Sequence, residues 1–122
     1  MAGAAVLDLV IKAAVNRARP DDAILQVFSP SFASGHVIIA TVFCGALYLT
    51  YRRFIRRQIL FTSFCVAIPV VMAASRLYLG VHWFTDVAAG ACFGIAWLAF
   101  VFLTDEAYRA YKNKQQERLF RN

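Results

Sequence analysis

The chain has 122 residues, of which 61% are hydrophobic and 16% are charged, and its formal net charge is +6. This length allows one domain at most, and the composition lies outside the soluble range, so the apolar side chains need a bilayer. The positive charge could indicate nucleic acid binding. However, the basic residues flank apolar stretches without interleaved aromatic side chains, and we expect no nucleic acid partner.

The first eleven residues form an apolar, helix-prone stretch that is too short to cross a membrane. The stretch lacks the basic start and the cleavage site of a signal peptide. It looks like the last turns of a longer helix. We therefore expect either a chain cut from a larger protein or a short helix that packs against the others without spanning.

Three longer apolar stretches follow, the first from about Phe32 to Tyr51. The other two carry no charge, from Gln58 to Ser75 and from Val87 to Thr104. Eighteen helical residues measure about 27 Å, which is close to the hydrocarbon thickness of a bilayer. The sequence therefore predicts an all-α, membrane-embedded bundle of three transmembrane helices and a short N-terminal helix over residues 1–106.

The basic residues are divided unequally between the two ends of these spans. Nine of the 13 lie where alternating spans share one side: Arg52, Arg53, Arg56 and Arg57 in a loop, and Arg109, Lys112, Lys114, Arg118 and Arg121 in the tail, residues 107–122. Positive residues mark the cytoplasmic side of the plasma (inner) membrane. The remaining four, Lys12, Arg17, Arg19 and Arg76, then fall on the extracytoplasmic side together with both histidines.

Lys12 and the pair Arg19-Pro20 are the first polar element on that side. We predict that Pro20 ends the N-terminal helix. An ammonium and a planar guanidinium at this spacing suit a tetrahedral oxyanion. The alternative is that both side chains only extend from the membrane rim to water.

Ser34, Gly35 and His36 are the second element, where a polar turn opens into an apolar helix. Ser34 can cap this helix, and the exposed backbone N–H groups, the helix dipole and the small glycine together form an anion site. His36 would then lie beside the anion. An interfacial histidine bonded to a carbonyl is the alternative.

Ser75, Arg76, His82 and Asp86 are the third and most specific element. His82 and Asp86 are four residues apart at the start of a helix, so they are expected to share a face. The carboxylate can accept the proton of one imidazole nitrogen and leave the other nitrogen free for nucleophilic or base chemistry. The alternative is that Asp86 caps the helix and His82 packs.

In this order, Lys-x6-Arg-Pro, Ser-Gly-His and Ser-Arg-x5-His-x3-Asp resemble the three signature motifs of the type 2 phosphatidic acid phosphatase superfamily. This superfamily also includes bacterial lipid pyrophosphatases and vanadium haloperoxidases. The resemblance implies that His82 attacks phosphorus and becomes a phosphohistidine, that Asp86 holds His82, and that His36 protonates the leaving oxygen. It also implies a phosphate cradle made of Lys12, Arg19, Ser34, Gly35, Ser75 and Arg76.

Two features depart from the family pattern. Ala33 stands where a proline normally precedes Ser-Gly-His, and the family usually has six spans, so about two and a half helices are absent before Lys12.

The phosphohistidine mechanism implied by the resemblance needs no cofactor and no metal. Two histidines and an aspartate could pass for metal ligands, but three cations at one point would repel Mg²⁺ or Zn²⁺.

The resulting hypothesis is hydrolysis of a lipid phosphate or diphosphate at the extracytoplasmic face. No side chain distinguishes phosphatidate from phosphatidylglycerol phosphate or from an isoprenoid diphosphate such as undecaprenyl pyrophosphate. A lipid phosphotransferase would use the same residues. A non-catalytic packing module is the third hypothesis, because Gly90 and Gly94 form a GxxxG pattern that supports helix–helix association or packing within the chain.

Overall fold

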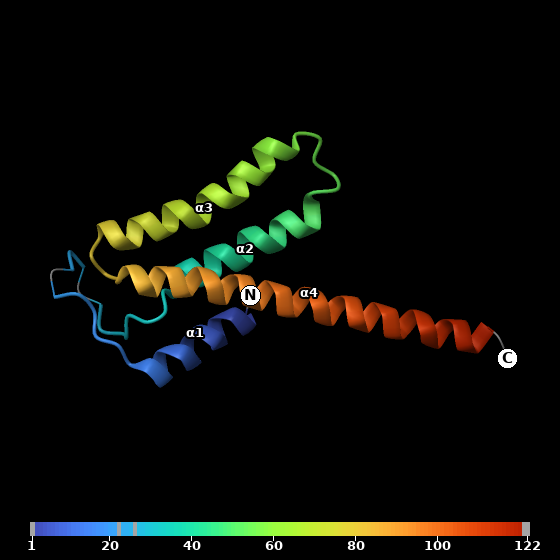
Figure 1. The fold of residues 1–122 in the computed structure, drawn as a ribbon, viewed down its shortest axis with the longest axis horizontal. Helices are drawn as coiled ribbons and strands as arrows, with labels where there is room; N and C mark the ends of the chain where they lie inside the picture. The colour runs from blue at the N-terminus through green and yellow to red at the C-terminus, as the bar shows by residue number, and fades with distance from the viewer. Residues whose placement is uncertain (1, 22, 26, 121–122) are drawn as a thin grey trace.

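The computed structural model describes residues 2–21, 23–25 and 27–120, with side chains described as far as Glu117. Its four helices are α1 (Ala2–Val15), α2 (Gly35–Tyr51), α3 (Gln58–Tyr78) and α4 (Phe84–Phe120). α2 lies between the other three and contacts each of them (Figure 1). The prediction of an all-α bundle with a short N-terminal helix is confirmed.

Two of the helices, α3 and α4, are long and apolar enough to cross a membrane. α2 has 17 residues and is shorter than the predicted span, because Ser34 is extended at φ −73° and the helix begins only at Gly35. α3 exposes a series of large apolar side chains, which are Ile59, Leu60, Phe64, Val66, Val70 and Val71. A helix surface of this kind suits lipid better than water.

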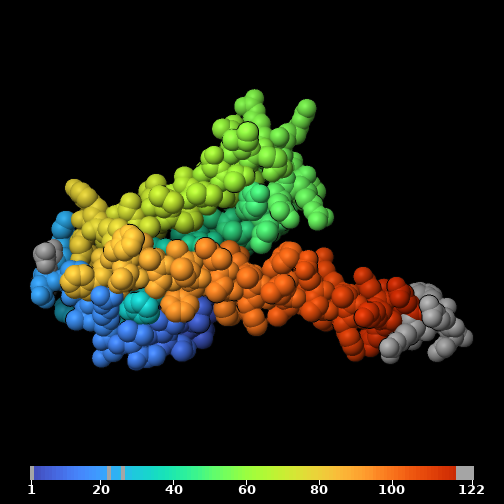
Figure 2. Space-filling model, viewed as in Figure 1, coloured from blue at the N-terminus to red at the C-terminus, as the bar shows by residue number. Residues whose placement is uncertain are grey.

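α4 is twice as long as the predicted span. Its 37 residues correspond to about 55 Å, and the helix continues through Thr104 into the basic tail. No proline or glycine interrupts it there, and Arg109 bonds to Asp105 one turn earlier at 2.8 Å. Figure 2 shows this part of α4 projecting beyond the other helices. Arg121 lies outside the described residues, and a separate tail from residue 107 stays a prediction.

The end of α1 was predicted wrongly. The helix ends at Val15, five residues before Pro20, and Asn16 has a positive φ of 43°. Asn16 closes the helix by donating its N–H to the carbonyl of Lys12 at 2.9 Å. Asparagine tolerates this left-handed conformation better than most residues, which explains the early end. Residues 17–19 are therefore free to cross to the start of α4.

The two glycines of α4 pack against α2 of the same chain. A Cβ on Gly90 would lie 2.8 Å from the carbonyl oxygen of Ser34, and one on Gly94 would lie 2.8 Å from Cβ of Thr41. This close approach also lets the Ser34 N–H donate to the carbonyl of Asp86 at 3.0 Å. Packing within the chain accounts for the GxxxG pattern, and it joins the second polar element to the third.

Gly90→Ala should lower the free energy of unfolding in detergent by about 1–3 kcal/mol, because a backbone oxygen rather than a flexible side chain must move. Thermal unfolding followed by circular dichroism measures the change. Ala88→Val is the matched control, since Ala88 lies on the exposed side of the same helix. Equal loss of stability in the two variants would contradict the close α2–α4 contact.

Candidate active site

The three polar elements meet at one end of the bundle. This end is formed by the C-terminus of α1, the segment 16–34, the start of α2, the end of α3 and the start of α4 (Figure 1). The loop with four arginines, residues 52–57, lies at the other end of α2 and α3. The bundle thus separates the cations near the histidines from the arginines of residues 52–57.

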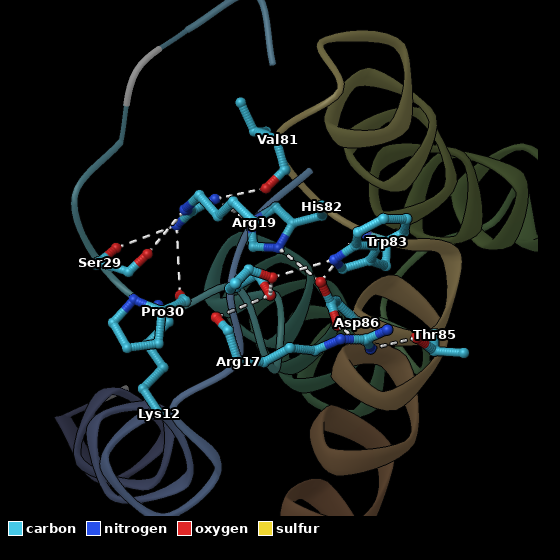
Figure 3. Close-up of polar contacts among 12 residues, drawn as sticks. Lys12, Arg17, Arg19, Ser29, Pro30, Val81, His82, Trp83, Thr85 and Asp86 are labelled. Atoms are coloured by element: carbon cyan, nitrogen blue, oxygen red, sulfur yellow. Dashed lines mark hydrogen bonds and ion pairs between the residues drawn. The ribbon is translucent and has the colours of Figure 1, made fainter. Parts of the chain in front are cut away.

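His82 lies in the turn between α3 and α4 and is 6% exposed. Its Nε2 is 3.5 Å from Nη1 of Arg19, and its Nδ1 is 3.6 Å from Oδ2 of Asp86 (Figure 3). Burial, and then the charge of Arg19, lowers the pKa of His82, while Asp86 opposes the shift. A lowered pKa favours the neutral ring at pH 7, and a neutral imidazole has the lone pair that nucleophilic attack requires.

Asp86 is fully buried and holds two partners at hydrogen-bond distance. Its Oδ2 accepts the backbone N–H of Trp83 at 2.9 Å, and its Oδ1 accepts Nη1 of Arg17 at 2.9 Å. Trp83 precedes α4 and Asp86 is the third residue of the helix, so the carboxylate closes half of a capping box. Asp86 therefore caps α4 and also lies close to His82, two roles that were alternatives at the level of the sequence.

The predicted hydrogen bond between His82 and Asp86 is not formed in this structure. The separation of 3.6 Å is longer than a hydrogen bond, and Nδ1 has no other partner within the described part of the chain. His82 also lies two residues before α4, so the two residues do not share a helical face. They come close because the turn at 79–83 folds His82 back toward the first turn of α4.

Arg19 is held by a set of carbonyl groups. Its Nε donates to the carbonyl of Ser29 at 2.8 Å and its Nη1 to the carbonyl of Val81 at 2.6 Å. Nη2 reaches Oγ of Ser29 at 3.1 Å and the carbonyl of Pro30 at 3.4 Å. Burial lowers the pKa of Arg19, but guanidinium stays charged in proteins. A fixed cation therefore faces Nε2 of His82.

Lys12 is paired with an acidic residue of its own helix. Its Nζ lies 2.8 Å from Oδ2 of Asp8, one turn earlier on α1. The same carboxylate lies against Gly35, where an added Cβ would be 2.5 Å from Oδ2. The spacing of four residues on a helix could have identified this pair. The absence of a side chain at Gly35 lets the Asp8–Lys12 pair approach the start of α2.

Ser34 and His36 differ in how they are exposed. Ser34 precedes α2 as predicted, but its buried hydroxyl makes no capping hydrogen bond and has no partner in the described ranges. His36 is exposed in the first turn of α2, and partial burial followed by the charges of Arg76 and Lys12 lowers its pKa. His36 is therefore placed where an incoming anion and its leaving group can reach it.

Ser75 and Arg76 lie in the last turn of α3. The Ser75 hydroxyl donates to the carbonyl of Met72 at 2.8 Å, and Nε of Arg76 lies 3.4 Å from the same hydroxyl. Ser75 thus bonds within its own helix. The charge of Arg76 adds to burial in lowering the pKa of His36. The three cations of the predicted phosphate cradle, Lys12, Arg19 and Arg76, lie at the same end of the bundle. Ser75 instead makes a hydrogen bond within the last turns of α3.

Arg17, which the sequence marked only as one of four basic residues on this side, contacts Thr85, Asp86 and Trp83. Its Nη1 donates to Oγ1 of Thr85 at 2.6 Å as well as to Asp86, and its guanidinium lies 5.4 Å from the ring centre of Trp83. The ion pair joins residues 69 positions apart. No local spacing rule could have found it.

The chemistry of the site favours an anion over a metal ion. Across the described residues, no group of three or more His, Cys, Asp or Glu side chains could hold a metal ion. Asp86 is already paired with Arg17, and Nε2 of His82 faces Arg19. A neutral imidazole surrounded by cations can attack an electrophilic centre that carries anionic oxygens.

Comparisons with known proteins show which proteins this chain is similar to. The family model described as PAP2 superfamily matches residues 1–109. Phosphatidylglycerophosphatase B of Bacillus subtilis (strain 168) is 32% identical over 118 residues, and the match covers 89% of this chain and 56% of that protein. The crystal structure of a transmembrane PAP2 type phosphatidylglycerolphosphate phosphatase from Bacillus subtilis has a TM-score of 0.75 and 31% identity. It matches 87% of this chain, which spans just over half the length of these relatives.

Proposed function

Because this membrane protein belongs to the PAP2 superfamily, we propose that it carries the catalytic machinery of a lipid phosphatase. The reaction is hydrolysis of a phosphomonoester or pyrophosphate bond of a membrane lipid. One observation carries the proposal: His82 is buried, with Nε2 facing the guanidinium of Arg19 and Nδ1 facing Asp86.

The reaction proceeds in two steps on His82. Its Nε2 lone pair attacks phosphorus, the bond from phosphorus to the lipid oxygen breaks, and His36 gives its proton to the leaving oxygen. A water molecule then attacks the phosphohistidine, returns a proton to His36, and phosphate leaves with the N–P bond broken. Lys12, Arg19 and Arg76 stabilise the charge on the equatorial oxygens, and Asp86 stabilises the positive charge on His82.

The relatives indicate the first substrate to test. Both carry names that refer to phosphatidylglycerol phosphate, so this lipid is the leading candidate for the present chain. Phosphatidate and undecaprenyl pyrophosphate are the comparison substrates. The site is assigned to the extracytoplasmic face of the plasma membrane, because the arginines of residues 52–57 and the basic tail lie at the opposite end.

Phosphate release by the purified chain in detergent micelles tests the proposed function. Phosphatidylglycerol phosphate should be hydrolysed, orthovanadate should inhibit, and EDTA should leave the rate unchanged. Loss of activity in EDTA that Mg²⁺ restores would replace the proposed chemistry with a metal-dependent one. Absence of phosphate release from all three lipids would overturn the proposal for this chain.

The pH profile of kcat/KM should be bell-shaped, with its acid limb below pH ~6.5, the ordinary pKa of histidine. Burial and Arg19 lower the pKa of His82, so the neutral form persists to lower pH and activity is lost only as the pH falls through that pKa. Loss of the His36 proton gives the alkaline limb, and because burial and then the charges of Arg76 and Lys12 lower the pKa of His36 too, this limb also begins below the ordinary pKa of histidine. In His36→Asn the alkaline limb should disappear and the acid limb remain. An acid limb above that pH would contradict a neutral His82 nucleophile.

A further inference from the structure

Arg17 occupies one of the six unspecified positions between Lys12 and Arg19, yet it makes the closest side-chain contact to Asp86. The pair of Nη1 and Oδ1 is 2.9 Å long, whereas His82 stands 3.6 Å from the other carboxylate oxygen. We propose that Arg17 is a positioning residue that shares the charge of Asp86 with His82 and so limits how strongly the carboxylate holds the imidazole. This inference rests on the proposed function.

The need for Arg17 follows from the burial of Asp86. The side chain of Asp86 is fully buried, so its negative charge must be neutralised inside the protein. Apart from Arg17, its near partners are the neutral N–H of Trp83 and the imidazole of His82. Arg17 supplies the positive charge, and His82 can then remain neutral next to a buried carboxylate.

Arg17 is fixed at both its backbone and its side chain. Its carbonyl accepts the N–H of Ser31 at 2.9 Å, and its guanidinium lies against Trp83 and bonds to Thr85. The Trp83 indole N–H in turn donates to the carbonyl of Ala18 at 3.1 Å. These contacts direct the guanidinium to the carboxylate rather than to a phosphate on His82. Arg17 therefore acts through Asp86.

The charges around His82 determine the direction of the effect. α1 contributes Lys12, the segment 16–34 contributes Arg19, and α4 contributes Asp86. His36 of α2 and Arg76 of α3 lie at the same end of the bundle. Removal of the Arg17 charge leaves His82 as the nearest ionisable side chain to Asp86, and only the more distant charge of Arg19 still acts on this carboxylate. The carboxylate then favours the imidazolium. The pKa of His82 should rise.

The chain has only two histidines, so imidazole NMR can follow His82 directly in detergent micelles. His36→Asn assigns the signals. In Arg17→Gln the titration midpoint of His82 should rise by about one pH unit, and Arg17→Lys should bring it back close to the wild-type value because the charge is kept. Arg109→Gln is the matched control. It removes an exposed arginine from the ion pair with Asp105 on α4 and should shift nothing.

Kinetics give a second readout. Arg17→Gln should be about tenfold slower in kcat/KM on the acid limb and should approach the wild-type rate above the new midpoint. An unchanged His82 midpoint, or an equal loss of rate at every pH, would overturn the inference and assign Arg17 a purely structural role. If the midpoint rises while the wild-type chain hydrolyses no lipid phosphate, the electrostatic role of Arg17 stands and the proposed function fails.

Discussion

His82→Asn should reduce lipid phosphate hydrolysis by at least about 10⁴-fold, because the variant lacks the nitrogen that forms the bond to phosphorus. Asparagine is polar and smaller, so it fits the buried turn between α3 and α4 without adding a charge. Phosphate release and the trapping of an acid-labile, base-stable phosphoenzyme with radiolabelled substrate measure the loss. Both signals should disappear together.

His36→Asn is the matched control for this loss, since it removes the other imidazole. With p-nitrophenyl phosphate, whose leaving group needs no proton, His36→Asn should still form the phosphoenzyme at a rate near that of the wild type. His82→Asn should not form it. Phosphate release by His82→Asn within tenfold of the wild-type rate would exclude His82 as the nucleophile.

The helices could be predicted from the sequence because the apolar stretches are long and bounded by charge. Their ends could not, since each depends on a local feature weaker than the apolar pattern. α1 ends where Asn16 adopts a positive φ, not at Pro20, and α4 continues past Thr104 because nothing in the tail breaks a helix. The apolar pattern predicts where a helix lies in a bilayer, and backbone conformation decides where it ends.

The chemical types in the candidate site were also predictable, and the structure brings the predicted cations and both histidines to one end of the bundle. The partners of Asp86 were not predictable. Asp86 can bond to His82, to the Trp83 N–H or to Arg17, and the geometry of the turn and of segment 16–34 selects the last two. Contacts over 60 residues or more, such as those of Arg17 with Asp86 and of Arg19 with Val81, join parts of the chain that no local spacing relates. The catalytic roles remain predictions.

Arg19→Lys should lower kcat/KM by about 10²–10³-fold, although the charge is kept. The guanidinium donates hydrogen bonds to the carbonyls of Ser29 and Val81, and its Nη1 also faces Nε2 of His82. An ammonium group is a point charge, and it cannot hold both carbonyls and also face the phosphoryl group. Arg53→Lys is the matched control, because Arg53 lies exposed in the loop at the opposite end of the bundle.

Orthovanadate separates a catalytic role of Arg19 from an anchoring role. Bound to His82, vanadate resembles the five-coordinate transition state, so a residue that stabilises this state should affect inhibition and catalysis in parallel. The inhibition constant for vanadate should therefore rise in Arg19→Lys by about the same factor by which kcat/KM falls. If kcat/KM falls and vanadate inhibits as strongly as before, Arg19 serves only to fix the segment that carries Ser29. The stabilisation of the equatorial oxygens would then fall to Lys12 and Arg76.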